Sequence, residues 1–513
     1  MQNTSKKRFF YSLKYFKLIV NRKIDKRWTL IRRLGAGGNG EVWQCRDLDG
    51  TEYAIKFLKY AYKEPYSRFY DEVAFMESFG NIDGVLPIIA KNAPAGVSQY
   101  TKTKSPYYYV MPLATSLGSD LYYESIERKV EIIRFLLEML ITLHKQNIAH
   151  RDIKPSNILL YQGQYVLSDF GLVYFQGKTS KTVQNRPLGA KWTRSPQMER
   201  DAGAADGFKS DVYAMAKTIW MIFTGDFTSF EGQYDASSSF LSLRKYIQGK
   251  YVTPLEELLS RCTDHEEERR PTAQEFLDGF VDWININNDW DRENLLQWVE
   301  VHKRIFPLHE PDHAEWVDLG RIVGILNILG SYESLNHLFF PNGGGLDLTG
   351  ARLSDEEGFV ELEFGGIQYL VCPEKLIFER MSDDFQWNYF RLELTEIAPR
   401  FKDYMVDEYL EEYGTVTHSD ESVAAISLRK YDELDSEQVE KLNAHRISRY
   451  LKGSMVIFHK DSFYNQLVSQ YRGEHDKMPA DEFKRQIGVL SQKMKGKTMA
   501  DIRNTKKIIL NRK

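Results

Sequence analysis

The chain has 513 residues, of which 42% are hydrophobic and 13% aromatic, and its formal net charge is −4. This composition predicts a globular protein of about two to four domains, and the near-neutral balance excludes a general attraction to nucleic acid or membranes. Three widely spaced cysteines, Cys45, Cys262 and Cys372, argue against a disulfide framework or a zinc site and indicate a reducing compartment. Since no run of about 18 apolar residues occurs, we expect a soluble, cytoplasmic protein without a spanning helix.

Residues 1–27 form a basic N-terminal arm. Residues 1–33 hold eleven Lys or Arg and a single acid, Asp25. A basic amphipathic segment can bind a membrane or an acidic partner. The aromatic residues of the arm favour instead a helix or arm that packs beside the first domain and buries Phe9, Phe10, Tyr15 and Phe16.

A glycine-rich turn follows in "RWTLIRRLGAGGNGEVW", with Gly35, Gly37 and Gly40 ahead of Val42. Alternating apolar residues on both sides predict two strands joined by this turn, whereas in a Rossmann site the third glycine opens a helix. Glycines at these places would let backbone amides close over phosphates. Alone, the spacing fits a plain hairpin equally well.

Further along, "AIK" places Lys56 in a strand, and "SRFYDEVAFMESFG" predicts a helix whose apolar face carries Phe69 and Met76. Glu72 adjoins that face. If Glu72 points inward, it can pair with Lys56 and fix the ammonium group to hold nucleotide phosphates; otherwise it is a surface carboxylate. Residues 107–114 then read as a buried strand that ends at Pro112.

Charged residues gather in "AHRDIKPSNILL", after a predicted amphipathic helix, and in the "DFG" that follows. Asp152 can accept or orient the proton of an attacking hydroxyl, and Lys154 can neutralise charge on a phosphoryl group. Asn157 and Asp169 can together hold a divalent metal that bridges phosphates. Phosphoryl transfer requires mainly such positioning and charge neutralisation.

With these motifs in order, residues 28–285 resemble a eukaryotic-like (Hanks-type) serine/threonine protein kinase. The match comprises the glycine loop at 35–42, the lysine of "AIK", "HRDIKPSN" at 150–157 and "DFG" at 169–171. In addition, "SDVYAMAKTIWMIFTG" resembles the central buried helix of the family, with Asp211, and "RRPTAQEF" resembles its closing arginine motif, with Arg270. The resemblance implies a bilobal α+β fold, with a β-rich N-lobe at 28–113 and a helical C-lobe at 114–285.

The resemblance also implies residue roles, with ATP as the nucleotide and Mg²⁺ or Mn²⁺ as the metal. Asp152 becomes the catalytic base, Lys154 the phosphate-neutralising residue, and Asn157 and Asp169 the metal ligands. The implied nucleotide site comprises the glycines of the loop, the pair of Lys56 and Glu72, the adenine-sandwiching Val42, Ala54 and Leu159, the gatekeeper Met111, and the hinge residues Pro112, Leu113 and Ala114. Met76, His150 and Phe170 would stack as an internal spine with an apolar residue of "LPIIA".

The lysine in "HRDIKPSN" is the serine/threonine form of the loop. Arg151 suggests control by a phosphate on the activation segment, since an arginine at that place can pair with a phosphorylated side chain. The candidate acceptors are Thr179, Ser180 and Thr182, which could equally be plain loop residues.

Two positions depart from the family pattern. The family's "APE" appears as "SPQ", so Gln197 replaces the glutamate that would pair with Arg270. Gln197 or Glu199 could take its place, and either would leave a weaker clamp. Ala190 stands where a threonine normally follows the glycine of the substrate-binding loop, and Thr193 could compensate. Both departures bear on substrate preference and basal rate.

Residues 286–513 carry no motif that we recognise, and we predict a separate α+β domain. The expected helices are "NLLQWVEVHKRIF", "RIVGILNILGSYESLNHLFF" and "RFKDYMVDEYLEEYG". The expected strands are a hairpin about Gly365 and Gly366 and the segment "WNYFRLELTEI". His302, His309, His313 and His337 lack the paired spacing of metal sites, so surface or core histidines are expected. The basic tail reads as a solvated helix rather than a nucleic-acid site.

The sequence thus predicts an ATP-dependent serine/threonine protein kinase that phosphorylates proteins, including its own activation segment. Its C-terminal domain would supply regulation, substrate recruitment or self-association. Two alternatives come from other classes: a nucleotide-binding pseudokinase scaffold, which would bind ATP without turnover, and a small-molecule kinase. The intact set of Lys56, Asp152, Asn157 and Asp169 argues against the scaffold. The full glycine-loop and "DFG" signatures argue against the small-molecule kinase.

Overall fold

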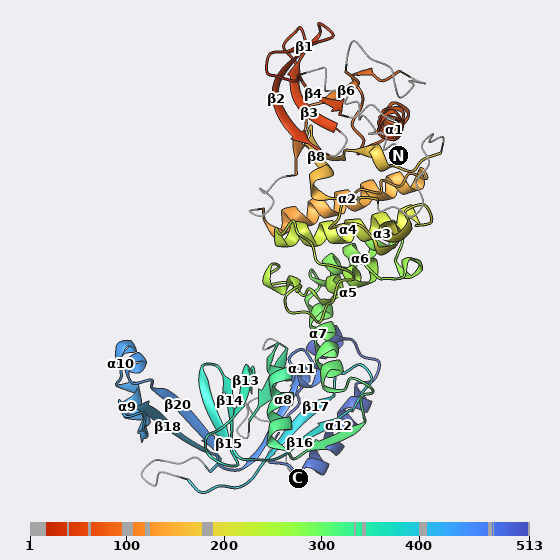
Figure 1. The fold of residues 1–513 in the computed structure, drawn as a ribbon. Coiled ribbons are helices and arrows are strands. Elements are labelled where there is room, and N and C mark those ends of the chain that lie inside the picture. The colour runs from red at the N-terminus through yellow and green to blue at the C-terminus, as the bar shows by residue number, and fades with distance from the viewer. Residues whose placement is uncertain are drawn as a thin grey trace, which may run out of the picture. The chain divides into compact units, whose positions relative to one another are not determined.

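The computed structural model describes residues 17–37, 40–59, 63–94, 106–117, 124–176, 188–332, 335–340, 345–399, 408–469, 475 and 477–510. The chain divides into two compact units, Met1–Asn288 and Asp289–Lys513 (Figure 1). Each unit has hydrophobic cores of its own. The aromatic residues of the expected N-terminal arm and the three candidate phosphorylation sites lie outside the described residues.

The N-lobe of the first unit is a six-stranded antiparallel sheet with the order β1-β2-β3-β4-β6-β5. Its strands are β1 (Lys23–Ile24), β2 (Trp28–Ala36), β3 (Gly40–Arg46), β4 (Glu52–Leu58), β5 (Ala90–Asn92) and β6 (Tyr108–Pro112). The glycine turn joins β2 to β3, as the sequence predicts. One helix, α1 (Lys63–Phe79), follows β4.

Both faces of this sheet are covered, because its strands alternate apolar side chains to either side. On one face α1 contributes Phe69 and Val73 to the large core that continues into the C-lobe. On the other face Trp28, Trp43 and Phe57 form a second apolar cluster, onto which Leu18 and Ile24 of the N-terminal arm pack. Residues 17–27 therefore belong to the body of the N-lobe.

The C-lobe is built around two long helices, α2 (Ile126–Lys145) and α4 (Gly207–Thr224). Ser125 caps α2 by accepting a hydrogen bond from Arg128 N, and Asp206 caps α4 in the same way. Gly225 ends α4 at φ 72°, in the left-handed region that favours glycine. Around them lie α3 (Pro196–Asp201), α5 (Thr253–Cys262), α6 (Ala273–Ile286) and the small sheet of β7 (Thr115–Ser116), β8 (Ile158–Tyr161) and β9 (Gln164–Leu167).

The second unit contains two six-stranded sheets. The first has the order β10-β16-β17-β21-β11-β12, from β10 (His313–Trp316), β16 (Pro373–Glu379), β17 (Tyr389–Leu394), β21 (Gly453–His459), β11 (Asn336–Phe339) and β12 (Gly345–Leu346). The second has the order β13-β14-β15-β20-β18-β19, from β13 (Gly350–Leu353), β14 (Val360–Phe364), β15 (Ile367–Val371), β20 (His445–Tyr450), β18 (Leu410–Thr417) and β19 (Val423–Ile426).

Seven helices accompany these sheets among the described residues: α7 (Trp290–Ile305), α8 (Leu319–Gly330), α9 (Leu428–Asp432), α10 (Ser436–Lys441), α11 (Phe463–Leu467), α12 (Ala480–Lys493) and α13 (Met499–Arg503). One apolar core joins residues of the two sheets, such as Phe378 and Phe364. A second core packs Phe458 and Tyr389 of the first sheet against Phe483 of α12. The unit thus combines sheets and helices and is α+β, as the sequence predicts.

The predicted hairpin about Gly365 and Gly366 is present. These glycines join β14 to β15 with φ values of 60° and 73°, which non-glycine residues rarely adopt. Two predicted helices were partly wrong. The helix expected through residue 340 ends at Gly330, and β11 follows it. Of the acidic helix expected at residues 400–414, residues 400–407 lie outside the described residues, and residues 410–414 are instead the start of β18, which pairs with β20.

The four histidines of this unit that the sequence singles out are not gathered into one cluster. His302 is buried and contacts Glu310 at 2.9 Å, while His313 contacts Glu379 and His337 contacts Asp347. The basic tail is residues 493–513. Helix α12 ends at Lys493, and α13 is the helix that follows it among the described residues. No helix in the described ranges is both long and apolar enough to span a membrane.

Lys217 is an unusual residue of the C-lobe, because it lies buried within α4. The residue is 3% exposed, and its ammonium group donates a 2.5 Å hydrogen bond to the carbonyl of Phe230 and lies over the rings of Phe230 and Tyr213. Burial lowers the pKa of Lys217 to about 8. The folded chain therefore releases this proton near pH 8, whereas an unfolded chain holds it to about pH 10.5.

We expect Lys217→Met to remove part of the pH dependence of stability. Between pH 8 and 10.5 the unfolded chain binds more protons, so the free energy of unfolding rises with pH by at most about 1.4 kcal/mol per unit. The substitution should flatten this rise and stabilise the protein at pH 7 by about 1 to 3 kcal/mol. Denaturant unfolding across pH 7–10 measures both effects. Lys245→Met, at an exposed lysine of the same lobe, is the control; equal pH profiles for both variants would contradict the expectation.

Candidate active site

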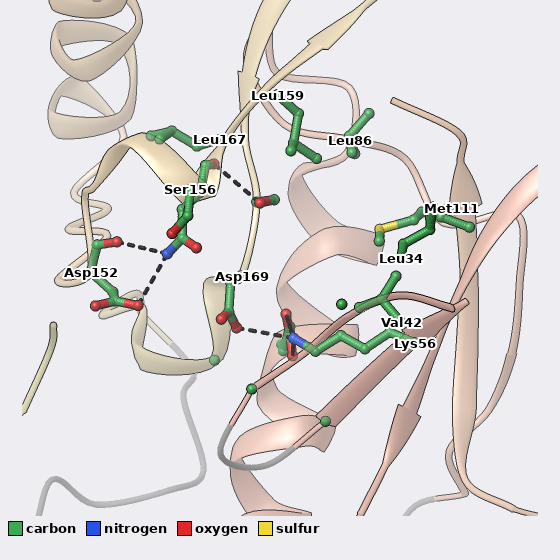
Figure 2. Close-up of a pocket in the computed structure, with 18 of the residues that line it drawn as sticks. Leu34, Val42, Lys56, Leu86, Met111, Asp152, Ser156, Leu159, Leu167 and Asp169 are labelled. Atoms are coloured by element: carbon green, nitrogen blue, oxygen red, sulfur yellow. Dashed lines mark hydrogen bonds and ion pairs between the residues drawn. The ribbon is translucent and has the colours of Figure 1, made fainter. Parts of the chain in front are cut away.

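A cleft of about 940 Å³ opens in the first unit between the glycine turn and the loop that precedes β8 (Figure 2). Its lining includes every predicted catalytic, nucleotide-binding and metal-binding residue: Gly35, Gly37, Gly40, Val42, Ala54, Lys56, Glu72, Met111, Leu113, Asp152, Lys154, Asn157, Leu159 and Asp169. The separate sequence motifs therefore meet in one place.

The ammonium group of Lys56 lies between two carboxylates. It contacts the carboxylate oxygens of Glu72 at 2.7 and 2.9 Å and Asp169 Oδ1 at 3.0 Å, and Figure 2 shows the second ion pair. Burial lowers the pKa of Lys56, but the charges of Asp169 and Glu72 outweigh it and hold that pKa well above the ordinary value. Lys56 in turn lowers the pKa of Asp169. Lys56 and Asp169 thus remain ionised, which the roles expected from the sequence, phosphate binding and metal binding, would require.

Glu72 points into the lobe because α1 buries the face that carries it. Phe69, Val73 and Met76 of the same helix are all buried, and the Glu72 side chain is 3% exposed. The alternative interpretation of Glu72 as a surface carboxylate is therefore wrong. Burial raises the pKa of Glu72, and the Lys56 charge opposes that rise.

The loop at 150–157 is held in place by α4. Asp211 is fully buried and accepts hydrogen bonds of 2.7 Å from the backbone N–H groups of His150 and Arg151. Within the loop, Asn157 donates to the carbonyl and to Oδ2 of Asp152, at 2.8 and 3.0 Å, and Lys154 donates to the same Oδ2 at 2.8 Å. Asp152 Oδ1 is buried and accepts no hydrogen bond from the described residues.

The segment that carries Asp169 is anchored by Phe170. Asp169 adopts φ 63°, which turns its carboxylate toward the cleft, and its side chain is 49% exposed there. The Phe170 ring lies 4.8 Å from His150 and 4.5 Å from Phe75. The predicted contact of His150 with Phe170 is thus present, with the ring planes tilted by 59°, and Phe75 also packs against Phe170.

Asn157 and Asp169 fit a divalent cation by their chemistry. The amide nitrogen of Asn157 is used by Asp152, so its carbonyl oxygen remains for a metal, and the half-exposed Asp169 offers a carboxylate at the cleft. Hard oxygen donors of this kind suit Mg²⁺, which usually takes one or two carboxylates and completes its shell with water and substrate phosphates. Among the described residues no larger group of metal-binding side chains occurs.

The glycine turn lies close over Lys56. A Cβ atom at Gly40 would meet Lys56 Cε at 3.2 Å and the Phe57 carbonyl at 3.3 Å, so a side chain there would press on the strand beneath. Lys59 donates a 2.7 Å hydrogen bond to the Gly37 carbonyl and ties the turn to the residue that follows β4. The adenine-sandwiching residues implied by the sequence, Val42, Ala54 and Leu159, lie on the walls of the same cleft.

The described contacts of the Arg151 side chain are with α3 and the residue that follows it. Its backbone adopts φ 67°, and its buried side chain donates to the Ala202 carbonyl at 2.5 Å and contacts the sulfur of Met198. The candidate acceptors Thr179, Ser180 and Thr182 lie outside the described residues.

Gln197 takes the place of the missing glutamate. Its Oε1 accepts a 2.6 Å hydrogen bond from Arg270, and its Nε2 donates one of 2.6 Å to the His265 carbonyl. Glu199 instead forms an ion pair with Arg194. A glutamate could not make the donation to His265, so the clamp is built differently in this chain.

The loop at 188–190, where the sequence lacks the expected threonine, is held by Arg194. Arg194 donates two hydrogen bonds to the Gly189 carbonyl, at 3.1 and 2.7 Å, next to Ala190. Thr193 is buried, and its backbone N–H donates to the Ala190 carbonyl. A Cβ at Gly189 would lie 3.8 Å from Asp152 Oδ1, so this loop borders the free oxygen of Asp152.

Sequence reasoning missed Tyr109. Its hydroxyl donates a 2.9 Å hydrogen bond to Glu72 Oε1, and its ring lies 5.7 Å from Lys56 Nζ. The alternation along β6 could have placed Tyr109 on the α1 side of the sheet, but nothing in the sequence indicates its partner.

Comparison with known proteins finds protein kinases. A model of the protein kinase domain matches residues 28–281. The serine/threonine-protein kinase PrkC of Bacillus subtilis (strain 168) is 27% identical over 239 residues, which cover 44% of this chain and 35% of PrkC. The probable serine/threonine-protein kinase PknB of Lactococcus lactis subsp. lactis (strain IL1403) is 26% identical, covering 43% of this chain and 34% of PknB. A crystal structure of a kinase domain aligns over 52% of this chain and 98% of its own at 15% identity, with a TM-score of 0.40.

The first unit has a β-rich N-lobe and a helical C-lobe, the bilobal arrangement expected of a protein kinase domain. Residues 28–281 belong to the protein kinase domain family, and the curated relatives are of the serine/threonine type. The chain spans only about a third of the length of these two relatives.

The hydrogen bonds of Gln197 with Arg270 and with the His265 carbonyl should contribute to stability. Gln197→Ala should lower the free energy of unfolding by about 1 to 3 kcal/mol, because it leaves the buried Arg270 guanidinium without this side-chain acceptor. Gln197→Glu should change stability by less than about 1 kcal/mol, since a stronger contact with Arg270 is offset by loss of the donation to His265. Denaturant unfolding measures both, with Glu199→Gln as the exposed control. A loss in Gln197→Glu as large as in Gln197→Ala would show that the bond to His265 dominates.

Proposed function

We propose that this chain is an ATP- and Mg²⁺-dependent protein kinase that phosphorylates serine and threonine hydroxyls. The observation that carries the proposal is the state of Asp152. One oxygen of its carboxylate is held by Lys154 and Asn157, while the other borders the loop at 188–190 and accepts nothing from the described residues. A free oxygen there is what an incoming hydroxyl group requires.

In the proposed reaction the acceptor hydroxyl donates its hydrogen bond to Asp152 Oδ1 and gives its proton to that carboxylate. The oxygen forms a bond to the γ-phosphorus as the bond from that phosphorus to the departing ADP oxygen breaks. Lys154 lies 2.8 Å from Asp152 Oδ2, where its charge neutralises the transferring group, and Lys56 holds the nucleotide phosphates. Mg²⁺ held by Asn157 and Asp169 would neutralise charge on the β- and γ-phosphates.

The adenine would lie between Val42, Ala54 and Leu159, beside the gatekeeper Met111 and the hinge residue Leu113. These residues line the cleft, and their apolar side chains suit a flat base.

The proposal includes autophosphorylation at Thr179, Ser180 or Thr182. It also includes a cytoplasmic setting, supported by Cys45, Cys262 and Cys372 as free thiols.

The division of labour between Asp152 and Lys56 can be tested with labelled ATP and Mg²⁺. Asp152→Ala should lower phosphate transfer by about 10² to 10⁴ and leave nucleotide binding largely intact, because Asp152 acts on the acceptor. Lys56→Ala should weaken nucleotide binding itself. Phosphate transfer, nucleotide titration and mass spectrometry of the modified sites measure these effects. Asp49→Ala, at an exposed turn, is the control; loss of ATP affinity in Asp152→Ala equal to that in Lys56→Ala would contradict the assigned roles.

Wild-type protein that binds ATP but transfers no phosphate, to itself or to a mixture of protein substrates, would contradict the proposal. That result would favour a nucleotide-binding scaffold.

For the second unit we propose regulation of the kinase, recruitment of its protein substrates or self-association. Its separate cores support a unit that folds by itself. Deletion of residues 289–513 should therefore leave a fragment that unfolds cooperatively, with altered activity or target choice. Calorimetry, light scattering and phosphate transfer by the fragment measure these properties. A fragment that cannot fold would show that the two units depend on each other.

A further inference from the structure

Three consecutive tyrosines, Tyr107, Tyr108 and Tyr109, enter β6 and place their hydroxyl groups in three different surroundings. Alternation along the strand sends Tyr108 to the outer face of the N-lobe sheet, where it donates to Asp25 at 2.7 Å. Tyr107 and Tyr109 lie on the α1 side and are each 1% exposed. Tyr109 donates to Glu72, whereas the Tyr107 hydroxyl has no partner among the described residues.

The Tyr109 hydroxyl shares its acceptor with Lys56. Glu72 Oε1 receives Tyr109 at 2.9 Å and Lys56 at 2.7 Å, and Glu72 Oε2 receives Lys56 at 2.9 Å. A buried carboxylate needs several donors to offset the loss of water. Lys56 donates hydrogen bonds to both Glu72 and Asp169. The Tyr109 hydroxyl donates to Glu72 and not to Asp169.

The ring of Tyr109 is held in place by α1 itself. It packs against Phe69 with the centroids 5.5 Å apart, one turn before Glu72 on the same helix. The hydroxyl therefore contacts Glu72 from a ring that the helix has already fixed. Sheet and helix are joined here by a hydrogen bond that is present without a bound nucleotide.

We propose that Tyr109 is a positioning residue that holds Glu72, and with it α1, turned toward Lys56 before the nucleotide binds. The inference rests on the proposed kinase function and adds a determinant of phosphate binding from outside the catalytic motifs. Tyr109 acts through Glu72 and contacts no reacting atom. Its contribution accordingly falls on nucleotide affinity, with little effect on the phosphoryl-transfer step.

Tyr109→Phe in the full-length protein tests this role, since it removes one hydroxyl and keeps the ring packed on Phe69. We expect the affinity for ATP with Mg²⁺ to fall about tenfold, as loss of one hydrogen bond to a buried charge implies, with kcat changed less than about threefold. Amide hydrogen exchange in α1 should be faster in the nucleotide-free protein. Tyr107→Phe is the matched control, because it removes an equally buried hydroxyl from the same face and should leave ATP affinity unchanged.

A double-mutant cycle separates positioning from general packing. If Tyr109 acts through Glu72, then Tyr109→Phe in a Glu72→Gln background should weaken ATP binding by less than about twofold beyond Glu72→Gln alone. Independent, multiplying losses would overturn the inference. So would a Tyr109→Phe protein that melts earlier but binds ATP like wild type, because the hydroxyl would then serve only the core.

The kinase proposal and the inference about Tyr109 fail on different results. If the wild-type protein transfers no phosphate, the kinase proposal fails, yet the cycle on ATP affinity still decides the role of Tyr109. If phosphate transfer is normal and the cycle shows no coupling between Tyr109 and Glu72, the kinase proposal stands and the inference about Tyr109 is wrong.

Discussion

The geometry of the cleft depends on one cation, the ammonium group of Lys56. It joins β4 to Glu72 of α1 and to Asp169 in the segment after β9, so three parts of the chain meet at a single charge. Glu72 is buried, and an unpaired carboxylate at that place would be costly. The position of α1 and the orientation of Asp169 are therefore set together by the Lys56 ammonium group.

The opposite wall is fixed by a buried anion. Asp211 of α4 accepts the backbone N–H groups of His150 and Arg151, and Arg151 adopts a left-handed conformation that a non-glycine residue rarely takes. Asp169 has the same kind of conformation. These two left-handed residues, Arg151 and Asp169, lie at the points where the chain presents Asp152 and Asp169 to the cleft. The N-lobe contributes a long side chain, Lys56, and the C-lobe contributes a rigid loop.

The resemblance to the kinase motifs grouped Lys56, Asp152, Asn157 and Asp169 into one expected site, and the structure places all four on the lining of one cleft. The elements of the second unit were harder to predict. The segment "EYLEEYG" predicts a helix because it is rich in good helix formers, whereas in the structure the pairing of β18 with β20 overrides that preference. Contacts such as that of Tyr109 with Glu72 join segments distant in sequence, and no local pattern encodes them.

The two departures from the kinase pattern have different consequences. At Gln197 the clamp on Arg270 survives in a neutral form, because the amide both accepts from Arg270 and donates to His265. At Ala190 no hydroxyl is available, and the loop is held instead through the Gly189 carbonyl by Arg194. Asp152 Oδ1 thereby keeps no donor from the described protein residues. The Asp152 carboxylate therefore has hydrogen-bond donors on Oδ2 and none from the described residues on the buried Oδ1, and the proposed substrate hydroxyl would supply the missing donor.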